Sequence, residues 1–167
     1  MGVGKTTIGR QLAKSLHREF IDSDREIEQR TGVRIALIFE IEGEAGFRER
    51  ESQMLTDLTR RRDIVLATGG GAVIRAENRR LLSDRGVVVY LRAPLALLVE
   101  RTARDRQRPL LQNNDPKATL TALLAEREPL YREIADLIVD TGHRTVRHIV
   151  NEIRVFLDAC QDAHRPR

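Results

Sequence analysis

The sequence has no tryptophan, and aromatic residues make up only 4% of its 167 residues. Proteins that hold single-stranded nucleic acid stack the bases on several exposed rings, so this composition argues against that class. There is one cysteine, Cys160, so an internal disulfide is excluded. A chain without disulfides fits a reducing compartment, and we expect a cytoplasmic protein.

Long apolar runs are missing as well. No stretch approaches the roughly 18 apolar residues that a membrane helix needs, so we expect no membrane partner. The 29 basic residues are almost all arginine, and they alternate with 25 acidic residues to leave a net charge of +4. Such mixing is typical of solvated surfaces, and we expect no nucleic-acid partner.

The composition that remains, 41% hydrophobic and 32% charged, is typical of one soluble globular domain over residues 1–167. Short apolar runs predict buried parallel strands at Phe20–Ile21, Ile64–Ala67, Val87–Leu91 and Leu137–Val139. Helical spacing predicts helices at Thr6–Leu16, Asp24–Arg30, Ile35–Ile41, Gly46–Arg61, Ala76–Asp84, Leu95–Arg104, Pro116–Ala125, Glu128–Ala135 and Arg144–Ala159. This alternation indicates an α/β fold with a parallel sheet. We expect a monomer, with a disordered tail at residues 160–167.

The first seven residues, MGVGKTT, match the second half of the phosphate-binding pattern G-x-x-x-x-G-K-[ST]. Glycines let backbone N–H groups approach phosphate, and the start of a helix adds its positive end. Lys5 would reach the β- and γ-phosphates of ATP, and the Thr6 hydroxyl would bind Mg²⁺. The predicted ATP-binding residues are Gly2, Val3, Gly4, Lys5, Thr6 and Thr7. The alternative is a glycine-rich start followed by a threonine cap.

A phosphate-binding loop normally follows a central strand, and the pattern's first glycine would lie two residues before Met1. We therefore expect that the natural chain starts earlier, by a few apolar residues and one glycine. A damaged relative of such a protein is the alternative.

Two aspartates follow the first predicted strand. Asp22 and Asp24 lie at its carboxyl end, where α/β sheets place ligands, and strand geometry would point both carboxylates the same way. One could hold Mg²⁺ through water, and the other could accept a hydroxyl proton. Alternatively, Asp24 is the N-cap of the helix that follows.

Arg48 and Glu51 are neighbours at i and i+3 on a predicted helix. A guanidinium held by a carboxylate is an organised fork for an anion, although an exposed ion pair is the simpler interpretation. Gly69, Gly70 and Gly71 follow a predicted strand, where a flat ligand can lie against backbone N–H groups. A plain flexible turn is the alternative there.

Two further arginines are candidates for the site. Arg108 belongs to a polar segment, about 104–116, with a proline near each end, which predicts a mobile lid that excludes water and brings a positive charge to the phosphates. An ordinary charged linker would look the same. Arg127 precedes Pro129 at a predicted break between two helices, where it could point into a cleft or lie on the surface.

Taken in order, the motifs are G-x-G-K-T-T, D-S-D, F-R-x-x-E, G-G-G, R-P-L-L and R-x-P-L-Y. This set closely resembles the shikimate kinase family, from Met1 to about Val155. The resemblance implies a P-loop kinase fold of the nucleoside monophosphate kinase type, with parallel strands in the order 2-3-1-4-5 flanked by helices. The family's first strand is central, and since it is absent here, a gap in the sheet is expected.

The resemblance also implies a reaction and residue roles. ATP is the co-substrate, Mg²⁺ the cofactor, and the γ-phosphoryl group goes to the 3-hydroxyl of shikimate in aromatic amino acid biosynthesis. The implied catalytic residues are Lys5, Asp24 and Arg108. The implied shikimate-binding residues are Asp24, Arg48, Gly69, Gly70, Gly71 and Arg127. Thr6 and Asp22, the latter through water, would hold the metal. Arg101, Arg108 and Arg144 would contact the nucleotide, while Val146 stands where some members carry proline near adenine.

Two other functions fit parts of the pattern. A different small-metabolite P-loop kinase, such as gluconate kinase, also needs arginines for a carboxylate. A kinase-like sensor that binds ligand without turnover is the other alternative, although such domains tend to lose the lysine, the aspartate or a clamp arginine.

Overall fold

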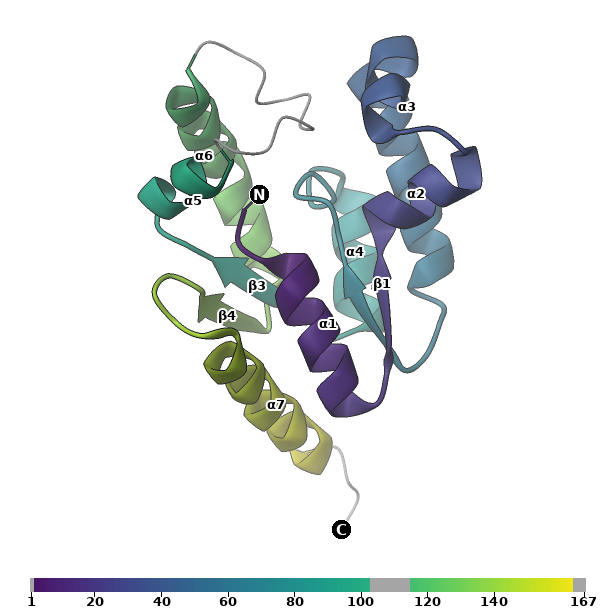
Figure 1. Cartoon of the computed structure of the whole chain (residues 1–167). Helices are drawn as coiled ribbons and strands as arrows, with labels where there is room; N and C mark the ends of the chain where they lie inside the picture. The colour runs from purple at the N-terminus through teal and green to yellow at the C-terminus, as the bar shows by residue number, and fades with distance from the viewer. Residues whose placement is uncertain (1, 103–114, 164–167) are drawn as a thin grey trace.

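The computed structural model describes residues 2–102 and 115–163, which form short strands separated by helices (Figure 1). The strands are β1 (Glu19–Asp22), β2 (Ile64–Ala67), β3 (Val89–Arg92) and β4 (Leu137–Asp140). The helices are α1 (Lys5–Leu16), α2 (Ser23–Thr31), α3 (Ile35–Leu58), α4 (Ala76–Arg85), α5 (Leu95–Thr102), α6 (Pro116–Ile134) and α7 (Val146–Ala163). The predicted alternation of strands and helices is confirmed.

The strands form two separate parallel pairs. β1 pairs with β2, with Glu19 opposite Ile64, and β3 pairs with β4, with Val89 opposite Leu137. Among the described residues β2 and β3 are not paired with each other, and their facing edges border a cavity. The expected gap in the sheet is therefore present, between β2 and β3.

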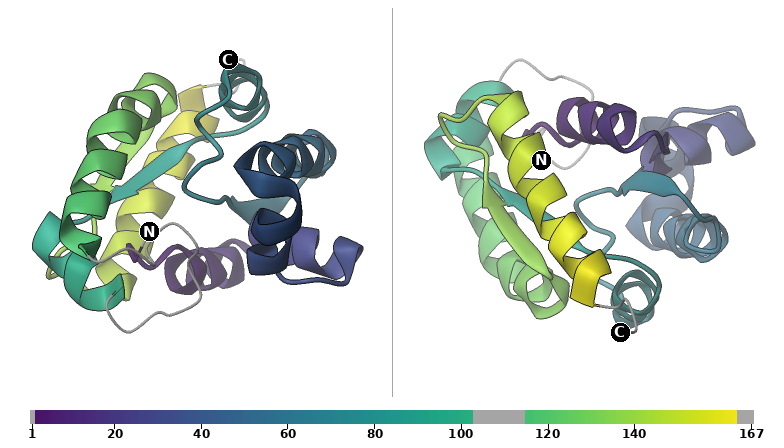
Figure 2. Two further views of the ribbon diagram at one scale, coloured as in Figure 1. Left: turned by 90° about the horizontal axis from the view of Figure 1, so that it is seen from above. Right: turned by 90° about the horizontal axis from the view of Figure 1, so that it is seen from below.

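Helices cover both faces of the strands. α1 packs along α7 and crosses both β1 and β2, while α3 packs on α4 and α4 on α6 at the other face (Figures 1 and 2). Each strand pair has its own apolar core. One core unites α1, β4 and α7 through Ile8, Leu12, Val139, Ile149, Val150 and Ile153. The other unites β1, α2 and α3 through Ile21, Ile27, Ile38, Phe47, Met54 and Leu58.

The helices depart from the sequence expectation in two places. α6 runs without a break through Pro129, where two helices were predicted. A proline in a helix removes one hydrogen bond but keeps a helical φ, and here packing holds both halves, since Leu120 is buried and the Tyr131 hydroxyl is bound to Gly70. α7 continues to Ala163, so residues 160–163 are helical rather than a disordered tail.

α3 keeps the two predicted helical segments but joins them at Gly43, whose backbone is not helical (φ 69°, ψ −177°). Only glycine adopts this conformation without strain. None of the helices in the described ranges has both the length and the apolar character needed to cross a bilayer.

Candidate active site

The amino-terminal loop has the backbone of an anion-binding turn. Gly2 and Gly4 have φ values of 69° and 91°, which side-chain-bearing residues rarely adopt. Gly4 is the N-cap of α1, so the helix presents its unpaired N–H groups at Lys5 and beyond. Val3 anchors the loop, because it is buried against Leu98 and Leu120. The loop therefore combines left-handed glycine turns with a helix start, an arrangement that can direct backbone N–H groups at an anion.

A hydrogen-bond chain joins this loop to the end of β1. The Thr6 hydroxyl donates to Asp22 Oδ2 at 3.2 Å, and the Asp24 N–H donates to Asp22 Oδ1 at 3.2 Å. Asp22 is thus the N-cap of α2, and the alternative that gave this role to Asp24 is wrong. The Asp24 carboxylate lies beside the glycine loop.

The glycine triplet lies against Asp24. The Gly69 N–H donates to Ser23 Oγ at 3.3 Å, which fixes the loop to the start of α2. A Cβ atom on residue 69 would lie 2.9 Å from Asp24 Oδ1 and 2.8 Å from Glu51 Oε1. The loop is therefore packed against two carboxylates.

Arg48 is buried between two carboxylates from its own helix. Its guanidinium donates to Glu51 Oε2 at 2.7 Å and to Glu44 Oε1 at 2.9 Å. Arg48 is only 7% exposed and Glu51 is fully buried, so the alternative of a surface ion pair is wrong. Burial on its own would lower the pKa of Arg48, but the charges and hydrogen bonds of Glu51 and Glu44 outweigh it and raise that pKa.

Glu51 gives the site a pH-dependent stability. Burial raises the pKa of its carboxyl above the ordinary 4.5, although Arg48 acts in the opposite direction. The pKa of Glu51 is higher in the folded state than in the unfolded state, so between these two pKa values the folded state binds more protons. The contribution of Glu51 to the free energy of unfolding therefore falls as the pH rises from about 4.5. Glu51→Gln removes the titration.

We therefore expect Glu51→Gln to gain stability relative to the wild type as the pH rises from about 4.5 toward neutrality. The measurement is the free energy of unfolding in urea for both proteins across this range. Other carboxylates, such as Glu42 and Asp57, have pKa values lowered by Arg50 and Arg30 respectively. Their effect on the free energy of unfolding is the same in both proteins, so it cancels when one value is subtracted from the other. A difference that does not change with pH would contradict a titrating buried carboxyl.

Arg127 approaches the same space from α6. It is 5% exposed, and its Nε has no hydrogen-bond partner among the described residues. The neighbouring Tyr131 hydroxyl donates to the Gly70 carbonyl at 2.5 Å, and its ring stacks on Tyr90 with centroids 4.9 Å apart. A buried guanidinium with an unused donor is suited to bind an anion, because the added hydrogen bond offsets part of the cost of desolvation. The interpretation of Arg127 as a surface residue is wrong.

The remaining predicted arginines differ in position. Arg101 lies beside the phosphate-binding loop, where it donates to the carbonyls of Gly2 at 3.2 Å and Gly142 at 3.5 Å. Arg144 forms an exposed ion pair with Glu152 on α7. Arg108 and most of the expected lid lie outside the described residues.

Comparison with known proteins gives a consistent result. The family profile described as shikimate kinase matches residues 1–158. The chain belongs to the shikimate kinase family. The shikimate kinase of Bordetella pertussis is 58% identical over 95% of this chain and 75% of its own length, and that of Burkholderia pseudomallei strain 1710b is 56% identical over 99% and 90%.

Solved structures support the same family. A shikimate kinase from Acinetobacter baumannii, in complex with shikimate, is 51% identical and superposes with a TM-score of 0.92 over 95% of this chain and 89% of its own. A gluconokinase from Sinorhizobium meliloti has a TM-score of 0.61 at 18% identity over 98% and 93%, which shows a shared fold alone. The predicted family and P-loop kinase fold are confirmed, in preference to gluconate kinase.

Proposed function

We propose that this chain transfers the γ-phosphoryl group of ATP to the 3-hydroxyl of shikimate. One observation supports this most directly: Asp24, Arg48 and Arg127 all lie against the glycine triplet, and Asp22 connects Asp24 to the amino-terminal loop. Phosphoryl transfer asks little covalent chemistry of a protein, because alignment and neutralisation of charge supply most of the acceleration. The chain provides groups that could align the two substrates and groups that could neutralise the phosphate charge.

At the nucleotide end, the amides of residues 2–7 and the start of α1 would hold the phosphates. Lys5 would neutralise the charge that develops between the β- and γ-phosphates. Arg101, already bound to the Gly2 carbonyl, would lie beside the nucleotide. Arg144 near the base and Arg108 above the phosphates remain expectations from the family resemblance.

The oxygen atoms of Thr6 and Asp22 fit Mg²⁺, because that ion prefers hard oxygen ligands and keeps water and phosphate in the rest of its shell. Among the described residues no cluster of three or more metal-binding side chains exists, and a nucleotide-borne Mg²⁺ does not require one. When bound, the ion would shield the phosphate charges. Thr6 and Asp22 would position it, directly and through water.

Asp22→Asn tests this role without disturbing α2, since asparagine caps a helix as well as aspartate does. We expect the Mg²⁺ concentration for half-maximal activity to rise about tenfold, with little change in the shikimate KM, because only the charge that attracts the ion is lost. EDTA should abolish activity, and added Mg²⁺ should restore it. An unchanged Mg²⁺ requirement would remove Asp22 from the metal site.

At the acceptor end, the guanidiniums of Arg48 and Arg127 would bind the shikimate carboxylate. Glu51 and Glu44 hold Arg48 in place, so little side-chain entropy is lost on binding. The ring would lie against Gly69–Gly71, and Asp24 would accept a hydrogen bond from the reacting hydroxyl. As the general base, Asp24 would take the proton when the hydroxyl oxygen attacks the γ-phosphorus.

Gly71→Ala tests the close approach of the glycine loop to Arg48. A methyl group at residue 71 would overlap the Arg48 guanidinium, so the arginine would have to leave Glu51. We expect the shikimate KM to rise about tenfold or more, as befits one lost charged hydrogen bond. Gly86→Ala is the control, because its added methyl would meet nothing closer than 3.9 Å. Equal KM values for the two variants would argue against the carboxylate clamp.

A coupled assay of ADP release tests the function as a whole, with shikimate, gluconate and a nucleoside monophosphate as acceptors. We expect shikimate to be phosphorylated fastest. Faster use of either other acceptor would overturn the proposal. Tight shikimate binding without ADP release would instead indicate a ligand sensor. We further propose a cytoplasmic monomer with small-molecule partners only, which sedimentation and cell fractionation would test.

A further inference from the structure

Tyr131 on α6 takes no part in the proposed phosphoryl transfer, yet it lies between two parts of the acceptor site. Its hydroxyl donates to the Gly70 carbonyl at 2.5 Å. A Cβ atom on residue 70 would lie 3.4 Å from that hydroxyl oxygen and 3.9 Å from Arg127 Nη1. Gly70, Tyr131 and Arg127 therefore lie together where the glycine loop, residues 69–71, faces α6.

The continuity of α6 brings the two side chains together. Arg127 and Tyr131 are four residues apart, so an unbroken helix places them on the same face. Pro129 lies between them, and α6 nevertheless runs from Pro116 to Ile134. A break at Pro129 would have put the guanidinium and the hydroxyl on separate helices. In one helix, a shift of either side chain is felt by the other.

The Tyr131 hydroxyl is a directional link between the loop and the arginine. A tyrosine hydroxyl has one hydrogen to donate, and Tyr131 gives it to the Gly70 carbonyl. Toward Arg127 the oxygen can therefore only accept, which suits a guanidinium. Burial raises the pKa of this hydroxyl, and the neighbouring charge of Arg127 acts against that rise. The hydroxyl thus keeps its proton at neutral pH and remains a donor to the loop.

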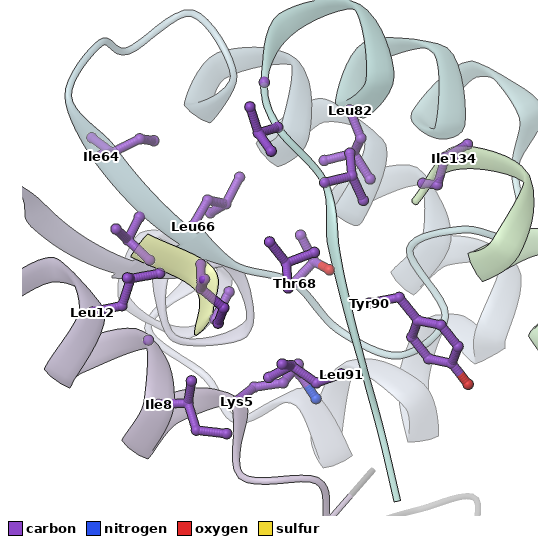
Figure 3. Close-up of a pocket in the computed structure, with 18 of the residues that line it drawn as sticks. Lys5, Ile8, Leu12, Ile64, Leu66, Thr68, Leu82, Tyr90, Leu91 and Ile134 are labelled. Carbon is purple, nitrogen blue, oxygen red and sulfur yellow. The ribbon is translucent and has the colours of Figure 1, made fainter. Parts of the chain in front are cut away.

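The ring of Tyr131 is held as well as its hydroxyl. It stacks on the ring of Tyr90, with centroids 4.9 Å apart and an angle of 26° between the planes. Tyr90 projects from β3 on the side where α6 ends at Ile134 (Figure 3). A side chain that is fixed at both ends has little freedom left to lose when a ligand binds. Tyr131 is therefore a rigid support for its neighbours.

The same helix holds the segment after the glycine loop at a second point. Glu133 accepts from Arg79 Nε at 3.0 Å. Arg79 Nη1 in turn donates to the carbonyls of Val73 at 2.9 Å and Ile74 at 3.1 Å. Three successive glycines give the loop little stiffness of its own. Its position relative to Arg127 is therefore set by contacts with the helix that carries Arg127.

We propose that Tyr131 is a positioning residue that fixes the spacing between the Arg127 guanidinium and the glycine loop. This spacing selects an acceptor in which a carboxylate is attached directly to a small ring, because the ring lies on the loop while the carboxylate reaches the guanidinium. Tyr131 acts through these two neighbours and not on the reacting atoms. The role rests on the proposed function, which supplies the ring and the carboxylate.

Tyr131→Phe removes the hydroxyl and keeps the stacked ring. We expect the shikimate KM to rise about tenfold, as for one lost hydrogen bond, while the ATP KM stays within about twofold of the wild-type value. Tyr90→Phe is the matched control. It removes the hydroxyl of the other ring in the stack, which forms no hydrogen bond with other described residues. This control should leave both KM values unchanged.

A double-mutant cycle separates positioning from a general loss of order. If Tyr131 acts through Arg127, the rise in shikimate KM caused by Tyr131→Phe should shrink to about twofold or less in the Arg127→Ala background. The same loss of effect is expected when the methyl ester of shikimate replaces shikimate as the acceptor. A merely structural role would raise the KM by the same factor in every case.

Hydrogen exchange tests the anchoring without any substrate. The amides of residues 69–71 should exchange about tenfold faster in Tyr131→Phe than in the wild type or in Tyr90→Phe, because the loop loses an anchor. Glu133→Gln weakens the second anchor at a half-exposed side chain, so it keeps the proposal testable if Tyr131→Phe folds poorly. It should raise the shikimate KM about two- to threefold, again only when Arg127 is present.

Three outcomes would overturn the proposal. They are an unchanged shikimate KM in Tyr131→Phe, an equal rise with and without Arg127, and unchanged hydrogen exchange of the glycine loop. A wild-type chain that does not phosphorylate shikimate would count against the proposed function instead. In that case the exchange rates still decide whether Tyr131 anchors the loop.

Discussion

Replacing Asp24 with asparagine is expected to lower kcat by about 10²- to 10⁴-fold, the usual range for the loss of a general base. Asparagine keeps the size of the side chain and can still contact a hydroxyl, so the shikimate KM should stay within roughly tenfold. The position of Asp24 supports a large effect on kcat with a small effect on KM. Its carboxylate lies beside Gly69 and Glu51, whereas Asp22 is the N-cap of α2. Steady-state kinetics with each substrate varied in turn would measure both constants.

Glu26→Gln is a matched control for this prediction. Asp24 and Glu26 are both acidic residues in the first turn of α2, so either change removes one negative charge from the positive end of the helix. Only the Asp24 change removes a group from the site. A kcat for Asp24→Asn close to that of Glu26→Gln would exclude Asp24 as the base.

Replacing Arg127 with alanine is expected to raise the shikimate KM by about 10- to 150-fold, with a much smaller effect on the ATP KM. The estimate corresponds to one hydrogen bond between charged groups, worth about 1.5–3 kcal/mol. Arg127 is buried and its Nε has no hydrogen-bond partner among the described residues, so this nitrogen can donate to the carboxylate. Initial rates over a range of each substrate provide the comparison.

The methyl ester of shikimate makes this second prediction specific to the carboxylate. The wild type should prefer shikimate to the ester strongly, and Arg127→Ala should discriminate far less, because the partner of the negative charge is gone. Arg132→Ala on the same helix is the control, since Arg132 forms only an exposed pair with Glu128. If the ATP and shikimate KM values rise equally, Arg127 does not bind the carboxylate.

Local patterns were sufficient to predict most of the elements. The four apolar runs became the four strands of the described residues, and the helix from Thr6 to Leu16 is α1 almost to the residue. Apolar runs and helical spacing depend on residues that are close in the sequence, so strands and helices can be predicted from them without knowledge of the tertiary structure. The break predicted before Pro129 was wrong, because packing outweighed a local helix-breaking signal.

The partners of the site residues were harder to predict. Glu51 was paired with Arg48 from spacing alone, but Glu44, which accepts from the same guanidinium, was missed although it lies one helical turn earlier. Ser23 and Tyr131 were missed for a different reason. Their contacts with Gly69 and Gly70 join segments 46 and 61 residues apart, and no local pattern carries that information.

The sequence by itself determined which chemical groups are present and in what order: a glycine-rich start with a lysine and two threonines, paired aspartates, arginines on separate segments and a glycine triplet. Only the tertiary structure decided which of them are buried and which meet. The ion pair of Arg48 and Glu51 is internal because α3 lies under the glycine loop, and Arg127 is enclosed because α6 packs toward the same loop. Hydrophobic spacing is a short-range property of the chain, whereas desolvation and close approach depend on atoms from elements far apart in sequence.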